Sequence, residues 1–231
     1  MPRRIDTLVV SGCGPSACAA AVADLDLSTA NVMRVNSWHM AERDCMDWKC
    51  DHWVIAEDQP GFVLAYRAWC LGHDPRPQLW YPGHATARRN ADFMRHMERF
   101  GARAQNNHWN LPDRSKWEGD LAPRRPLTGS FAIALGVALD PLHLILCGHD
   151  FYQGDAAETY AGGSTFDTLG GERDTFRQRY LNGGTPNHSL MADVCYISDA
   201  LAGFKGTVTA IGSAFERIFK PMFPDATYLP G

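Results

Sequence analysis

The stretch Leu127–Gln153, LTGSFAIALGVALDPLHLILCGHDFYQ, has the strongest structural pattern in the sequence. It opens on Thr-Gly-Ser and continues as the apolar run 131–139, which predicts a helix that is buried on several sides. The run 142–147 follows and is typical of a buried strand. It ends in Gly-His-Asp-Phe-Tyr (148–152), so polar groups stand at the carboxyl end of a strand, where open α/β sheets bind ligands.

The segments on either side repeat this alternation of strand and helix. They are strands over 5–10, 32–36, 53–57 and 207–211, and helices over 17–25, 85–100, 189–202 and 214–219. Such alternation predicts an α/β fold with a doubly wound, mainly parallel sheet of the Rossmann-like type. We find no linker or repeat and expect a single domain over 1–231, in which the polar, glycine-rich segment 153–187 is a flexible lid.

Charge and hydropathy exclude several classes of protein. Lys and Arg number 22 against 26 Asp and Glu, and the net charge of −4 provides no basic surface for nucleic acid. No apolar run approaches the roughly 18–20 residues that cross a bilayer. The first residues show no signal-peptide pattern. We expect a soluble cytoplasmic protein with no nucleic-acid partner and no transmembrane segment.

Two patterns resemble metal sites, and each has a simpler interpretation. The nearest approach to a zinc box consists of His39, Cys45, Cys50 and His52. These residues lie among tryptophans and methionines, which favours buried packing. Asp24-Leu25-Asp26 has the D-x-D pattern of metal-dependent glycosyltransferases, but it ends the first helix, away from the strand ends where a nucleotide and its ion bind. We expect no bound metal.

Gly12 and Gly14 lie between the first strand and the first helix. Glycines at such a turn let the backbone approach a phosphate, and the N–H groups at a helix start favour negative charge. The pattern Gly-x-Gly-x-x-Ala also occurs in dinucleotide-binding proteins, which need an acidic residue at the end of the second strand. Asn36 stands there instead. The turn therefore predicts a nucleotide or phosphate ligand rather than NAD or FAD.

Four stretches together resemble a known family, the bacterial sialyltransferases of glycosyltransferase family 42, of the Campylobacter lipooligosaccharide type. The central motif 127–153 is the longest match. The turn Gly-Cys-Gly-Pro-Ser (12–16) is similar to the family's Gly-Asn-Gly-Pro-Ser, 34–36 to its Arg-x-Asn, and 187–189 to its Gly-His-Ser. The resemblance reaches nearly the whole chain and is loose between about 59 and 124.

The resemblance implies a GT-A-like fold and a defined reaction. Sialic acid, or a related nonulosonic acid, passes from a CMP-activated donor to a galactose-type glycan acceptor. The implied transfer inverts the anomeric centre, uses no metal or other cofactor and forms an α2,3 linkage. The implied partners are CMP-sialic acid or a related CMP-sugar and the glycan acceptor. A homo-oligomer and a place in the cytoplasm or at the inner membrane are also implied.

The resemblance gives roles to individual residues by position. His188 is the general base that takes the acceptor hydroxyl proton. Tyr152, and Tyr160 in the lid, donate hydrogen bonds to the departing CMP phosphate, as a divalent cation does elsewhere. Arg125 lies near the anionic group of the donor or near the acceptor. The donor-binding positions are Gly12, Cys13, Gly14, Ser16, Asn36, Glu57, Thr128, Gly129 and Gly148.

Two of these positions depart from the family. Cys13 replaces the asparagine of the turn, and Glu57 replaces the asparagine after the third strand. A carboxylate at that place repels an anionic donor unless it is protonated, paired or turned away. Donors related to sialic acid, such as CMP-activated Kdo or pseudaminic acid, therefore stay open. So do two other functions, a non-catalytic nucleotide- or glycan-binding domain and a metal-dependent, diphosphokinase-like transferase.

Overall fold

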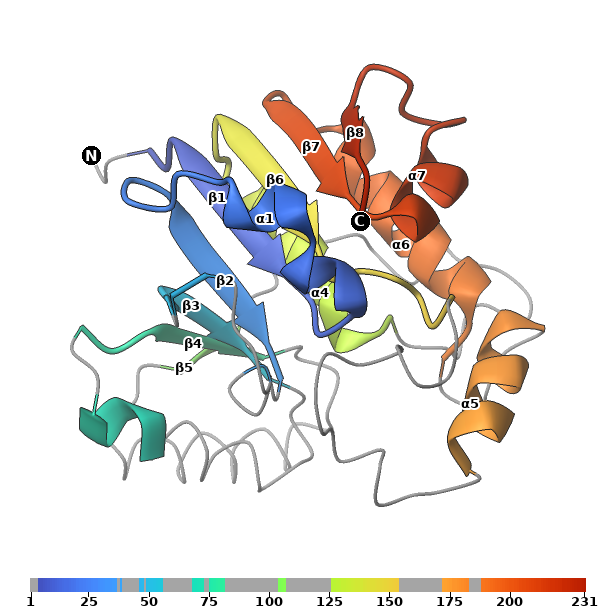
Figure 1. Cartoon of the computed structure of the whole chain (residues 1–231), viewed down its shortest axis with the longest axis horizontal. Helices are drawn as coiled ribbons and strands as arrows, with labels where there is room; N and C mark the ends of the chain where they lie inside the picture. Colours follow the sequence, from blue (N-terminus) through green and yellow to red (C-terminus); the bar gives the residue numbers. More distant parts are fainter. Residues whose placement is uncertain are drawn as a thin grey trace.

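The computed structural model describes residues 4–36, 38, 46–47, 49–55, 68–72, 75–81, 104–106, 126–153, 172–182 and 188–231. Within these ranges eight parallel strands form one sheet in the order β5-β4-β3-β2-β1-β6-β7-β8 (Figure 1). The strands are β1 (Thr7–Ser11), β2 (Asn31–Val35), β3 (His52–Val54), β4 (Gln78–Tyr81), β5 (Ala104–Asn106), β6 (His143–Cys147), β7 (Thr207–Ile211) and β8 (Thr227–Leu229). The helices are η1 (Pro15–Cys18), α1 (Ala20–Ala23), α4 (Thr128–Ala138), α5 (Glu172–Leu181), α6 (Leu190–Ala202) and α7 (Ser213–Phe219).

The direction in which the sheet grows reverses between β1 and β6. From β1 the chain adds β2 to β5 on one side, and from β6 it adds β7 and β8 on the other side. The two central strands end in register, with Ser11 opposite Cys147. Their carboxyl ends therefore form a topological switch point, the place where ligands bind in open α/β sheets.

Alternate side chains of β1 point to opposite faces of the sheet. Leu8 and Val10 belong to a core formed with α4, α6 and α7, whereas Val9 packs with Val22 of α1 on the other face. Figure 1 shows α1 on the face toward the viewer. Helices on both faces confirm the predicted doubly wound α/β fold.

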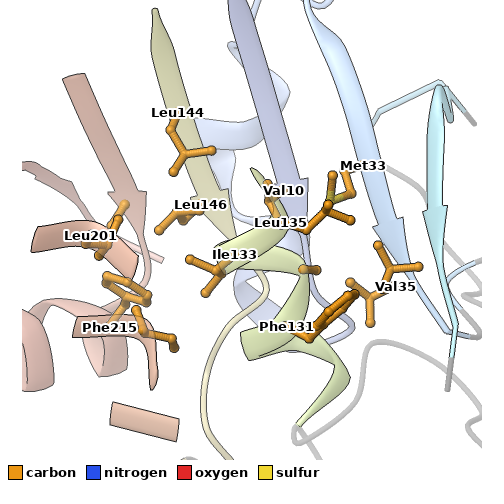
Figure 2. Packing of buried hydrophobic residues seen from close by; sticks show 14 of the residues in the cluster. Val10, Met33, Val35, Phe131, Ile133, Leu135, Leu144, Leu146, Leu201 and Phe215 are labelled. Carbon is orange, nitrogen blue, oxygen red and sulfur yellow. The ribbon is translucent and has the colours of Figure 1, made fainter. Parts of the chain in front are cut away.

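Helix α4 is apolar on all sides because the sheet covers one side of it and helix α6 covers another. Leu135 packs on the sheet beside Val10 and Phe131 packs beside Val35, as Figure 2 shows. Ala134 lies on the other side of the helix and packs against Tyr196 of α6. A helix enclosed in this way has no exposed polar stripe, which explains why the sequence of α4 lacks one.

Most of the predicted elements are confirmed, with ends that differ by up to three residues. These are β1, β2, β6, β7, α4, α6 and α7. The third predicted strand is β3, which is shorter than expected. The prediction of one continuous helix over 17–25 is wrong, because the structure has two short helical turns there. Ala19 has an extended backbone (ψ 152°) that separates the 3-10 turn η1 from the single turn of α1.

The structure also has elements that were not predicted, namely β4, β5, β8, α5 and the helical residues 68–72. Helix α5 occupies 172–181, so part of the expected lid 153–187 is helical. The expected helix over 85–100 lies outside the described residues. No helix in the described ranges combines the length and hydropathy that a membrane crossing requires.

Candidate functional site

A pocket lies at the switch point between β1 and β6. Its walls come from the loop after β1, the end of β2, the start of α4 and the loop after β6. The lining residues are Gly12, Cys13, Gly14, Val35, Asn36, Leu127, Thr128, Gly129, Ser130, Gly148, His149, Asp150, Phe151 and Tyr152. The pocket therefore occupies the position at which doubly wound sheets bind nucleotides.

The loops after β1 and β6 touch through their backbones, and this contact explains three glycines. The N–H of Gly14 donates to the carbonyl of Gly148 over 2.9 Å. A Cβ on Gly12 would stand 2.2 Å from the oxygen of Gly148, and a Cβ on Gly14 would stand 2.2 Å from Oδ2 of Asp150. Gly148 also has a left-handed backbone with φ +70°. These glycines are required by the loop contact, whatever ligand the pocket holds.

We expect Gly148→Ala to destabilise the protein strongly. The new Cβ would meet the carbonyl oxygen of Gly12 at 2.6 Å and would also force alanine into the left-handed region. Together these effects are expected to lower the free energy of unfolding by about 2–5 kcal/mol, measured by urea denaturation. Gly203→Ala is the control, since a Cβ there meets nothing within 4 Å and its φ is −95°. Equal stability of the two variants would contradict this description of the loop contact.

Ser16 and Asp150 join the two loops through side chains. The Ser16 hydroxyl accepts the N–H of Gly148 at 2.8 Å and donates to Oδ2 of Asp150 at 3.0 Å. The same carboxylate oxygen accepts the N–H of Ser16 at 3.0 Å. Burial raises the pKa of Asp150, and the bonds from Ser16 oppose the rise. Ser16, a predicted donor-binding residue, is buried and is placed where it holds the loops together.

Tyr152 has an unusual backbone that α5 stabilises. Phe151 and Tyr152 have φ values of 50° and 55°, and bulky residues rarely occupy this region outside functional sites. The Tyr152 carbonyl accepts a hydrogen bond of 2.7 Å from Nε of Arg177. Its ring meets the ring of Tyr180 edge to face, with centroids 5.3 Å apart. Helix α5 therefore holds both the backbone and the ring of Tyr152, a residue that lines the pocket.

A buried carboxylate, Asp193 of α6, connects α5 to the start of α4. It accepts the N–H of Leu127 and the hydroxyl of Tyr180, each over 2.7 Å, while the Ser130 hydroxyl is a further partner. Asp193 has no exposed surface. Burial raises its pKa to about 6, and the three hydrogen bonds oppose the rise. One side chain thus holds three segments around the pocket.

This raised pKa predicts a pH dependence of stability. The pKa rises from 3.8 in the unfolded chain to about 6 in the fold, so between these values the folded state binds more protons. The contribution of Asp193 to stability therefore falls as the pH rises from about 4 to above 6. Asp193→Asn removes this dependence. We expect its unfolding free energy, relative to the wild type, to increase by roughly 2 kcal/mol from pH 4 to pH 7.

Urea denaturation at pH 4, 5, 6 and 7 measures this difference. Asp225→Asn is the control because Asp225 is exposed. Parallel curves for Asp193→Asn and the wild type would refute a raised pKa at Asp193.

Cys13 and Asn36 both line the pocket where the first loop passes the end of β2. The thiol of Cys13 donates to the carbonyl of Val35 over 3.0 Å. Asn36 has φ 50°, its N–H donates to Val54, and its carbonyl accepts the indole N–H of Trp53 at 2.9 Å. The backbone of Asn36 is thus held by β3 while the residue lines the pocket.

His188 occupies a different place from the residues that line the pocket. It immediately precedes Ser189, the N-cap of α6, whose hydroxyl accepts the N–H of Ala192. The first turn of α6 also contains Asp193, which is bonded to Leu127 in the pocket wall. His188 is therefore at the end of α6 that is tied to the pocket. Three other predicted site residues, Arg125, Glu57 and Tyr160, lie outside the described residues.

The two patterns that resemble metal sites have other surroundings in the structure. The Cys50 thiol donates to the backbone of His52, and the His52 ring accepts the indole N–H of Trp80. His39 and Cys45 lie outside the described residues. Asp26 follows α1 and accepts the N–H of Ser28 at 2.9 Å, in a turn away from the pocket. In the described part of the chain, no three His, Cys, Asp or Glu residues gather as metal ligands do.

Comparison with known proteins gives relatives by structure alone. No sequence-family model matches the chain, and no curated protein does. CstII from Campylobacter jejuni, in complex with CMP, is similar at 17% identity over 90% of this chain and 80% of that chain, with a TM-score of 0.60. The chain has the sialyltransferase fold.

Two further sialyltransferase structures agree with this result. The monofunctional α-2,3-sialyltransferase Cst-I from Campylobacter jejuni is 15% identical over 91% of this chain and 77% of that chain, with a TM-score of 0.60. CstII in complex with a trisaccharide acceptor and CMP is 17% identical over 89% of this chain and 80% of that chain, with a TM-score of 0.59. The fold expected from the resemblance is thereby confirmed.

Several residues of the site were missing from the predicted site residues. Six of them line the pocket, namely Val35, Leu127, Ser130, His149, Asp150 and Phe151. His149 lines the pocket although it is buried, and Asp193 holds its wall together. The signal for His149 was its place directly after a strand and a glycine, within the central motif. Asp193 had no such signal, because in the sequence it is one polar residue within a helix.

Proposed function

We propose that this protein is an inverting, metal-independent sialyltransferase that uses a CMP-activated donor. The pocket at the switch point carries the proposal. It brings together residues of three of the four stretches that resemble family 42, including Gly14, Asn36 and Tyr152. The fold around this pocket is shared with sialyltransferases whose structures were determined with CMP.

The start of α4 supports binding of an anionic donor. Thr128 and Gly129 form its first turn and line the pocket. The first N–H groups of a helix have no partners within the helix, and the helix dipole favours negative charge beside them. A phosphate or a carboxylate of the donor is therefore stabilised here without a cation.

In the proposed reaction, the acceptor hydroxyl oxygen attacks the anomeric carbon of the sugar from the face opposite the phosphate. The bond between that carbon and the phosphate oxygen breaks, and CMP leaves with the electron pair. His188 takes the hydroxyl proton. Tyr152, with Tyr160, donates hydrogen bonds to the phosphate as its charge increases. Attack from the opposite face inverts the anomeric configuration.

Further parts of the proposal concern the surroundings of the pocket. Arg125 binds an anionic group of the donor or acceptor, and the segment 153–187 closes over the bound donor. Glu57 is neutral or paired while the donor is bound. The acceptor is a galactose-type glycan that receives an α2,3 linkage. The protein acts as a homo-oligomer in the cytoplasm or at the inner membrane, and light scattering tests its oligomeric state.

Product analysis tests the proposed activity. The protein is incubated with lactose and CMP-sialic acid, and in parallel with the CMP-activated forms of Kdo and pseudaminic acid. We expect a sialylated trisaccharide in the mass spectrum and an inverted, α2,3-linked residue in the NMR spectrum. If product forms only with one of the other two donors, that CMP-activated sugar is the donor of the enzyme in place of CMP-sialic acid. Binding of CMP with no product from any donor would favour the non-catalytic alternative.

A further inference from the structure

The pocket contains a polar group that the proposed reaction leaves unused, the imidazole of His149. The residue lines the pocket, although only 7% of its surface is exposed. Its Nε2 lies 3.2 Å from the carbonyl oxygen of Val10 in β1. Because a carbonyl oxygen only accepts hydrogen bonds, Nε2 carries the hydrogen, and this fixes the tautomer of the ring.

The other ring nitrogen, Nδ1, is consequently an acceptor at the pocket surface. It has no hydrogen-bond partner among the described residues. Among the described residues, Nδ1 of His149 does not belong to the side-chain polar atoms that are both sealed from solvent and unsatisfied, so it keeps accessible surface. It lies between Gly12 and Gly129, where added Cβ atoms would stand 3.1 and 3.2 Å away. Two glycines of the lining thus leave Nδ1 uncovered.

The surroundings also keep the ring neutral. Burial lowers the pKa of His149 to about 4, although its bond to Val10 opposes the change. A neutral Nδ1 accepts hydrogen bonds and offers only a lone pair to the oxygens of a phosphate or carboxylate. Anionic parts of a ligand are therefore expected at the start of α4, and a group with a hydrogen to donate is expected at Nδ1.

We propose that His149 is a specificity-determining residue whose Nδ1 accepts a hydrogen bond from an N–H or O–H group of the bound nucleotide. On cytidine this group is the exocyclic amine of the base or a ribose hydroxyl. The inference rests on the proposed function, which supplies the CMP-linked ligand. Once the ligand covers Nδ1, this acceptor selects strongly, because a nucleotide without the matching donor leaves Nδ1 unpaired and out of contact with water.

Two substitutions separate the two sides of the ring. In His149→Gln the side-chain amide reaches the position of Nε2 and keeps a donor for Val10, but the acceptor at Nδ1 is lost. In His149→Asn the carbonyl oxygen stands near the position of Nδ1 and keeps the acceptor. By calorimetry we expect His149→Gln to weaken CMP binding about tenfold, and His149→Asn to weaken it less than about threefold.

Binding of UMP, 2′-deoxy-CMP and 3′-deoxy-CMP identifies the group that His149 contacts. Removing that group weakens binding to the wild type but leaves the affinity of His149→Gln unchanged. The inference is overturned if His149→Gln binds CMP with the affinity of the wild type. It is also overturned if the substitution weakens the binding of all four nucleotides by the same factor. In both cases the proposed function stands. Failure of the wild type to bind CMP at all would overturn both.

Nitrogen NMR of the wild-type protein gives a test that needs no stable variant. In protein labelled with ¹⁵N-histidine, we expect the His149 ring to show a protonated Nε2 and an unprotonated Nδ1. Saturation with CMP should move the Nδ1 resonance toward the values of a hydrogen-bonded imine. An unchanged Nδ1 resonance under saturating CMP would overturn the inference.

Discussion

Replacing His188 with alanine is expected to lower turnover by about 100- to 10,000-fold, the range contributed by a positioned general base. The affinity for CMP should remain within about twofold, because a base that acts on the acceptor makes no contact that CMP binding requires. His188 directly precedes the N-cap of α6, outside the residues that line the pocket. Steady-state kinetics and CMP calorimetry on the same preparation measure the two quantities.

His143→Ala is the matched control for this prediction. It also removes a histidine, but at the start of β6, the strand end opposite the pocket. It should leave turnover close to that of the wild type. If His188→Ala loses CMP affinity and turnover to the same degree, His188 is part of the donor-binding site rather than the base.

Tyr152→Phe is expected to lower turnover by about 10- to 1000-fold, as the loss of one preorganised donor does. The substitution removes only the phenol hydroxyl. The ring contact with Tyr180 and the bond from Arg177 to the backbone carbonyl do not involve that hydroxyl, so the loop should keep its conformation. The effect is expected in kcat rather than in KM, because the donated bond strengthens as the phosphate leaves.

Tyr180→Phe is the neighbouring control. It removes the hydroxyl that donates to Asp193, and this should lower stability by about 1–3 kcal/mol while changing turnover less than Tyr152→Phe does. Unchanged kinetics of Tyr152→Phe would rule out a role for its phenol in leaving-group stabilisation.

The fold was predictable where a segment carries its own periodicity. The apolar run of α4 and the strand β6 have strong local patterns, and the structure forms both where they were expected. Strands β5 and β8 have three residues each, too few for a period of two to show. Helix α5, with the sequence ERDTFRQRYL, has few apolar residues and gives no core-facing stripe.

The candidate site was predictable in part, for a similar reason. The turn around Gly12 and Gly14 was identified from local sequence, yet the reason for these glycines is their contact with Gly148 in a distant part of the chain. The role of His149 depends on the carbonyl of Val10, 139 residues away, and no local pattern shows that distance. Long-range contacts of this kind appear only once the strands are placed side by side.

The rate of CMP release from CMP-sialic acid in the presence of EDTA, measured with and without a lactose-type acceptor, tests whether this protein is a metal-independent sialyltransferase. We predict release that the acceptor stimulates in a saturable manner and that His188→Ala lowers by about 100- to 10,000-fold. Stimulated release that EDTA eliminates and a divalent cation restores would contradict the metal-independent mechanism. Release that is absent with every acceptor and metal would contradict a sialyltransferase.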